Sequence, residues 1–272
     1  MVLQLTNSCL MGCPHCMHNA TPEPQHATDE TVDLGIEFAK RIGTKCVLVS
    51  GGEPTMNPNW VDMTSRVASA VPAVMIATNG TWLGNDDEEG KMIDLLKRHA
   101  NIKIQITSLR GLYREYERIT SQYPNFTQKL KANKLKHRSG IVRGDATEIR
   151  NMLALGRAID HEPSRKMADE NPYVMSCFQA AHITCQAKDL EKTIAVLESR
   201  IHFCHPIVDW KGDIHWSESI LCPAFGNVRE EYDILRKKAI EWRPCGKCHG
   251  YQKFIAKTDI KYITARVLMA MP

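Results

Sequence analysis

Short apolar runs alternate with longer amphipathic stretches along the first 160 residues, a pattern typical of repeated strand–helix units. Five apolar runs have the length of buried parallel strands, and each ends in polar or glycine-rich residues. These runs cover residues 2–6, 46–50, 73–78, 102–108 and 140–142. The amphipathic stretches predict helices over residues 29–42, 58–71, 87–99, 124–137 and 146–160. The pattern therefore predicts an α/β fold with a parallel sheet, and chemistry at the carboxyl ends of its strands.

Composition places the chain among globular proteins. It has 272 residues, 43% of them hydrophobic and 24% charged, and its net charge of +4 neither requires nor excludes an anionic partner. No apolar run is long enough to cross a membrane, and we expect a soluble, cytoplasmic protein. Because a reducing compartment keeps thiols free, the ten cysteines are not expected to form disulfides. The clustered cysteines are therefore predicted to bind metal, whereas Cys46 begins an apolar strand and is predicted to lie in the core.

Three cysteines follow the first predicted strand. Cys9, Cys13 and Cys16 are separated by three residues and then by two. A tetrahedral zinc site would need a fourth ligand, which His15 or His18 could supply. The other interpretation is a [4Fe-4S] cluster held by three thiolates, with one iron open to a substrate or cofactor. Spacing alone leaves both interpretations open.

Two more strand ends carry glycine-rich or small polar segments. The segment "SGGEPT" at 50–55 contains Gly51 and Gly52, which let the backbone pass close to a ligand, and Glu53, which can accept a hydrogen bond from a cationic group. The segment "TNGT" at 78–81 suits a turn with positive backbone angles. Each segment alone is a common turn.

In combination, the CxxxCxxC loop, the GGEP segment and the TNG segment at successive strand ends resemble the radical S-adenosylmethionine (SAM) enzymes over roughly residues 2–160. The resemblance implies a partial (β/α)6 TIM-like barrel. Family members usually carry an aromatic residue just before the third cysteine, where this chain has His15. The implied chemistry is electron transfer from a reduced cluster into SAM, which yields a 5′-deoxyadenosyl radical that removes a hydrogen atom from a substrate carbon. A partner such as flavodoxin or ferredoxin would supply the electron.

The same resemblance assigns roles to individual residues. Three cysteines would hold the [4Fe-4S] cluster and leave one iron open for the amino and carboxylate groups of SAM. Residues of the two polar segments would contact SAM, the first at its ammonium group and the second near its ribose or carboxylate. The assigned residues are Cys9, Cys13 and Cys16 for the cluster, Gly51, Gly52 and Glu53 for the ammonium group, and Thr78 and Asn79 for the ribose or carboxylate.

The end of the fourth strand resembles a further family segment. "SLRG" at 108–111 is similar to the frequent SLDG, with Arg110 in place of the acid. Ser108 is thus a candidate SAM contact. Arg110 either grips a carboxylate of the cofactor or an anionic substrate, or is an exposed surface arginine.

Four cysteines lie in the last third of the chain. A predicted hairpin with Gly212 at its turn is followed by "PAFGNV", an amphipathic helix near 229–242 and "CGKC". This order resembles the SPASM and twitch extensions, and it implies one auxiliary [4Fe-4S] cluster; a structural zinc site is the alternative. The chain would then divide into a barrel at 1–200 and a cluster-binding region at 201–272. The implied ligands are Cys204, Cys222, Cys245 and Cys248.

The substrate is less constrained by the sequence. Auxiliary clusters of this kind accompany modification of peptides or small molecules. Because the first strand begins at Val2, we expect no peptide-recognition domain ahead of it, which weighs against a peptide substrate. A nucleobase or nucleic acid is the alternative substrate, because the basic segment at 129–138 could contact phosphates. The other interpretation of this segment is a solvated helix face, and it has no aromatic neighbours on which bases could stack. A non-catalytic protein stabilised by zinc or a cluster would leave the GGEP and TNG segments unexplained. Cys177 and Cys185 either shape the substrate pocket or are buried and inert.

Overall fold

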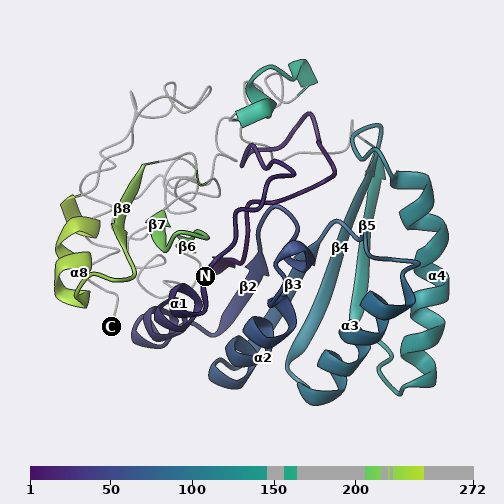
Figure 1. The fold of residues 1–272 in the computed structure, drawn as a ribbon, viewed down its shortest axis with the longest axis horizontal. Helices are drawn as coiled ribbons and strands as arrows, with labels where there is room; N and C mark the ends of the chain where they lie inside the picture. The colour runs from purple at the N-terminus through teal and green to yellow at the C-terminus, as the bar shows by residue number, and fades with distance from the viewer. Residues whose placement is uncertain (146–155, 164–205, 216–219, 221–222, 242–272) are drawn as a thin grey trace, which may run out of the picture.

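The computed structural model describes residues 1–145, 156–163, 206–215, 220 and 223–241. In this part of the chain an eight-stranded sheet has the order β5-β4-β3-β2-β1-β6-β7-β8 (Figure 1). The strands are β1 Val2–Gln4, β2 Cys46–Ser50, β3 Ala73–Thr78, β4 Ile102–Arg110, β5 Ser139–Asp145, β6 Ile207–Val208, β7 Asp213–His215 and β8 Ala224–Asn227. The α-helices are α1 Asp29–Arg41, α2 Trp60–Ala70, α3 Asp86–Arg98, α4 Tyr116–Ala132 and α8 Tyr232–Glu241.

Strands β1 to β5 are parallel, and a helix follows each of the first four. Figure 1 shows α1, α2 and α3 along one face of the sheet and the loop after β1 above the carboxyl ends of the strands. Close packing of α1 on β1 depends on Gly35, because a β-carbon there would lie 2.9 Å from Cδ1 of Leu3. The predicted α/β fold with a parallel sheet is thus confirmed.

Every second side chain of β4 faces the helices. Ile102, Ile104 and Ile106 are buried on that face, and Lys103 is exposed on the other. The same alternation in β3 buries Val74 and Ile76. Since period-two alternation fixes which face each residue meets, the strand register decides which polar side chains reach the site below.

Two predicted helices differ from the structure. The helix predicted over 124–137 begins eight residues earlier, at Tyr116, because burial of Ile119 extends it and the turn before Pro124 stays helical. It ends at Ala132, and Lys134 then adopts a left-handed conformation (φ 60°) that stops the helix. Of the helix predicted over 146–160 the structure describes only the end, and it forms a 3-10 turn, Gly156–Ile159.

Cys46 is exposed rather than in the core, so that prediction was wrong. It is the first residue of β2, whose burial alternates, and Val47 takes the buried position beside it. An apolar run predicts a strand but does not by itself give the phase of its two faces.

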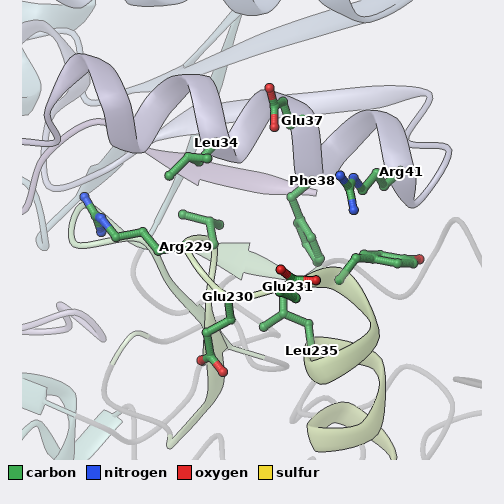
Figure 2. Close-up of a pocket in the computed structure, with 10 residues that line it drawn as sticks. Leu34, Glu37, Phe38, Arg41, Arg229, Glu230, Glu231 and Leu235 are labelled. Atoms are coloured by element: carbon green, nitrogen blue, oxygen red, sulfur yellow. The ribbon is translucent and has the colours of Figure 1, made fainter.

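The C-terminal elements continue the same sheet on the other side of β1. The predicted hairpin is confirmed: β6 and β7 are antiparallel, and Gly212 takes φ +91° at the turn. β6 pairs in parallel with β1, and β8, which was not predicted, follows β7. Figure 2 shows Phe38 of α1 and Leu235 of α8 on facing sides of the groove between these two helices. No described helix is long and apolar enough to cross a membrane.

Candidate functional site

The loop that carries the three cysteines is held in place by residues 51–53, the GGE segment. After β1, the backbone of Thr6 and Ser8 continues alongside β2, with Gly52 N donating to Thr6 O at 2.8 Å and Glu53 N to Ser8 O at 2.8 Å. A β-carbon on Gly51 or Gly52 would lie 2.4 Å from one of these carbonyl oxygens. Both positions therefore require glycine because two backbones approach closely.

The loop also closes on itself. Cys9 N donates to Thr21 O at 2.7 Å, and Asn7 N donates to Gln25 O at 2.8 Å, so the segment after the cysteines returns along the segment before them. The Ser8 hydroxyl accepts from Gln25 N at 2.9 Å. The cysteines thus project from a loop whose two ends are tied by hydrogen bonds.

The thiols of Cys9, Cys13 and Cys16 line one pocket of about 290 Å³ together with Gly51, Gly52 and Asn79. Two thiols receive hydrogen bonds to sulfur, Cys9 from Asn79 Nδ2 at 3.5 Å and Cys16 from Ala20 N at 3.4 Å. Burial, followed by the charges of the other two cysteines, raises the pKa of Cys13 to about 12. Three thiolates here would therefore need a nearby positive charge, such as a bound metal would supply.

Glu53 lies behind the pocket rather than in it. Its side chain has no solvent exposure and accepts three close hydrogen bonds, from Thr78 Oγ1 at 2.7 Å, Asn79 N at 2.8 Å and Thr55 Oγ1 at 2.9 Å. Burial raises the pKa of Glu53, and the donors oppose that rise. Thr78 also accepts from Trp82 Nε1 at 2.9 Å. Glu53 and Thr78 thus hold the turn that brings Asn79 into the pocket.

Ser108 and Arg110 do not line the pocket. Ser108 is fully buried, and its hydroxyl has no hydrogen-bond partner. Arg110 is exposed, with its guanidinium 5.3 Å from the centroid of the Tyr116 ring. Thr107 and Leu109, the alternate residues of β4, line the pocket instead. The alternation of "IKIQITSLR" is the sequence signal that could have identified them.

Two further pocket residues, Tyr113 and Arg157, carry no sequence signal of their own. The Tyr113 ring packs against His15 with ring centroids 5.4 Å apart, and burial, then the charge of Cys13, raises its pKa. Arg157 reaches the cysteine loop from 144 residues further along the chain, donating from Nε to Cys13 O at 2.9 Å. Contacts at such a separation cannot be inferred from local pattern.

The two loop histidines have different surroundings. Burial, then the positive charges of His161 and Arg157, lowers the pKa of His15 to about 4, and its Nδ1 is buried without a hydrogen-bond partner. His18 Nδ1 accepts from Ile220 N at 3.4 Å. Within the described residues, no three Cys, His, Asp or Glu side chains are grouped closely enough to hold a single metal ion.

A family model described as the Radical SAM superfamily matches residues 3–160, which is more than half of the chain. The chain belongs to the radical SAM superfamily. The matched region contains the cysteine loop, the GGE segment, the TNG turn and β4. The cysteines of the last third, Cys204, Cys222, Cys245 and Cys248, and also Cys177 and Cys185, lie outside the described residues.

Curated relatives resemble this radical SAM chain over short stretches. A probable GTP 3′,8-cyclase of Pyrococcus abyssi is 30% identical over 90 residues, which are 33% of this chain and 29% of the relative. An AdoMet-dependent heme synthase of Methanosarcina barkeri is 35% identical over 83 residues, 29% of this chain and 24% of the relative. The chain thus covers less than a third of either relative.

Two solved structures resemble a larger part of the chain, at lower identity. Native anSMEcpe with bound AdoMet and Cp18Cys peptide has a TM-score of 0.47 and 11% identity, covering 97% of this chain and 87% of that one. SuiB of Streptococcus suis bound to the precursor peptide SuiA has a TM-score of 0.46 and 12% identity, covering 86% and 63%.

Proposed function

We propose that the protein is a radical SAM enzyme that holds a [4Fe-4S] cluster on Cys9, Cys13 and Cys16 and removes a hydrogen atom from a substrate carbon. The convergence of these three thiols on one pocket carries the proposal. When bound, the cluster and SAM supply reductive cleavage of SAM to a 5′-deoxyadenosyl radical. The fit is supported by the sulfur hydrogen bonds from Asn79 and Ala20, which stabilise thiolate ligands.

The chain's own residues would orient SAM beside the cluster. Gly51 and Gly52 expose backbone at the pocket wall, and Asn79 adds a side-chain amide. His15 and Tyr113 form a ring pair against which a planar base can pack. The burial and hydrogen bonds of Glu53 and Thr78 support a role in positioning Asn79. Ser108 and Arg110 do not line the pocket, and their contact with SAM stays a prediction.

The proposal includes a second cluster in the C-terminal region. Cys204, Cys222, Cys245 and Cys248 would hold one auxiliary [4Fe-4S] cluster, on the strength of their order and spacing around the confirmed hairpin and α8. Zinc is the alternative occupant. In this scheme residues 1–200 form the radical SAM barrel and residues 201–272 the region of the auxiliary cluster.

A peptide or a small molecule is the proposed substrate class. The basic segment 129–138, which favoured a nucleic acid, lies at the opposite end of the sheet from the cysteines, because Arg138 precedes β5 and pairs with the start of β4. Lys129 forms ion pairs with Asp86 and Glu89. These contacts give Lys129 and Arg138 structural roles without a phosphate ligand.

Anaerobic reconstitution tests the proposed function. The reconstituted protein should contain iron and sulfide and should form 5′-deoxyadenosine when SAM and a reductant are added. Cys13→Ala should abolish the product, while Cys46→Ala, which replaces an exposed cysteine outside the pocket, should not. A fully loaded wild-type protein that makes no 5′-deoxyadenosine would contradict the proposal.

Metal analysis of a Cys9, Cys13 and Cys16 triple alanine variant tests the auxiliary site. Retention of about four irons per chain supports the second cluster, because the four C-terminal cysteines are the only predicted cluster ligands that this variant keeps. Retention of zinc would identify the alternative and remove the second cluster from the proposal.

A further inference from the structure

Arg157 spans the cysteine loop from outside. Its Nε donates to Cys13 O at 2.9 Å, and its Nη1 donates to Ala20 O at 2.8 Å and to Asn19 Oδ1 at 3.5 Å. The two carbonyls lie seven residues apart, on either side of Cys16. One planar guanidinium therefore fixes the distance between the two ends of the segment that carries the second and third cysteines.

Arg157 also brings charge to the pocket. Among the described residues that line it, Arg157 is the only lysine or arginine. With Nε 2.9 Å from Cys13 O, the guanidinium holds its positive charge beside the backbone of that cysteine. The guanidinium is thus the fixed cation of this pocket.

We propose that Arg157 is a positioning residue that holds the cysteine loop and whose charge raises the reduction potential of the cluster bound there. The inference rests on the proposed function. A reduced cluster carries one more negative charge than the oxidised cluster, so a nearby cation favours the reduced form. The charge of Arg157 would therefore affect reduction of the cluster, a step that precedes any reaction of the substrate.

The two roles of Arg157 can be separated by substitution. Arg157→Lys keeps the charge but not the planar fork that reaches two carbonyls, whereas Arg157→Gln removes the charge. Arg138 offers a matched control, because its guanidinium also donates to two backbone carbonyls, Ile102 O at 2.7 Å and His99 O at 2.6 Å, at the opposite end of the sheet. Arg138→Gln removes the same kind of contact far from the cysteines.

The measurement is an anaerobic redox titration of the reconstituted full chain followed by electron paramagnetic resonance. The signal that changes on addition of SAM belongs to the cluster with an open iron, which separates it from an auxiliary cluster. We expect Arg157→Gln to lower the ratio of reduced to oxidised cluster at a fixed potential about tenfold, which is about 59 mV for a one-electron couple. Arg157→Lys and Arg138→Gln should titrate like the wild type.

The outcomes are distinct. A loaded Arg157→Gln variant with the wild-type potential overturns the inference, and so does an Arg157→Lys variant shifted as far as Arg157→Gln. If Arg157→Gln holds no cluster, Arg157→Lys decides. A loaded variant with the wild-type potential supports the role of charge, and a loaded variant with a shifted potential overturns it. An empty variant reduces Arg157 to a residue that holds the loop and so overturns the proposal as stated. A wild-type protein that assembles no [4Fe-4S] cluster contradicts the proposed function instead.

Discussion

The side-chain amide of Asn79 lies 3.5 Å from the sulfur of Cys9, although the two residues are 70 positions apart. The same asparagine is fixed from behind, since its backbone N donates to Glu53 Oε2 at 2.8 Å and its Oδ1 accepts from Thr81 N at 2.9 Å. A turn that looks ordinary in the sequence thus presents one oriented N–H group to the sulfur of Cys9. The GGE and TNG segments act together through this contact.

Asn79→Asp isolates the contact with Cys9. The aspartate keeps the acceptor for Thr81 N but loses the donor to sulfur and places a negative charge beside a thiolate, so we expect iron loading to fall several-fold while the melting temperature stays near that of the wild type. Iron per chain and thermal unfolding of the metal-free protein check this. Asn59→Asp, at an exposed position before α2, is the control. Full loading of Asn79→Asp would show that the amide is dispensable.

Gly52→Ala should disrupt the cysteine loop. The new β-carbon would lie 2.4 Å from Ser8 O, a backbone atom that cannot move without shifting the loop. We expect a loss of about 1–3 kcal/mol in the free energy of unfolding, together with poor cluster assembly. Urea denaturation of the metal-free protein measures the first, and iron content the second.

Gly90→Ala is the matched control for this change. A β-carbon at Gly90, inside α3, meets no atom within 4 Å, so alanine should leave the fold intact and stabilise it by up to about 1 kcal/mol through helix propensity. Equal free energies of unfolding for Gly52→Ala and the wild type would refute the account of the GGE segment given by the structure.

Much of this site follows from local sequence. The strands at 46–50 and 73–78 were predicted with their observed bounds, because apolar runs between turn residues depend little on distant contacts. The two glycines were also singled out from the local sequence, although the carbonyls that require them, those of Thr6 and Ser8, lie more than 40 residues earlier in the chain.

Other parts of the site depend on packing and could not be predicted in the same way. The direction of the Glu53 carboxylate is set by donors from β3 and its turn, and the burial of Ser108 follows from the phase of β4. Arg157 reaches its loop over a separation of 144 residues. Each of these features depends on which helices, strands and loops become neighbours in the fold, and a short sequence motif does not predict that.

Glu53→Gln tests the buried carboxylate. Thr78 already accepts from Gly80 N at 3.0 Å and from Trp82 Nε1, so its hydroxyl must donate to residue 53, and Asn79 N must donate there too. A glutamine at position 53 can accept a hydrogen bond from only one of these two donors through its single oxygen. Its NH2 group would then face the other donor, the Thr78 hydroxyl or Asn79 N. We expect the free energy of unfolding to fall by about 1–3 kcal/mol.

The control for that substitution is Glu37→Gln on the exposed face of α1. It should leave the free energy of unfolding within about 0.5 kcal/mol of the wild type. Urea denaturation of both variants gives the comparison. If Glu53→Gln is as stable as Glu37→Gln, the carboxylate does not organise the turn at Asn79.

His15 occupies the place where an aromatic residue is usual in the family, and its ring packs against Tyr113. If packing is what this position supplies, His15→Phe should bind SAM within about twofold of the wild type, and His15→Ala should bind it about tenfold more weakly, because the flat apolar surface is lost. Tyr113→Phe keeps its ring and should behave like His15→Phe. Equilibrium dialysis of SAM against the reconstituted proteins gives the dissociation constants. A Phe variant as weak as the Ala variant would instead assign the role to Nδ1 of His15, the buried nitrogen without a partner, and would make a hydrogen bond to the cofactor the requirement at this position.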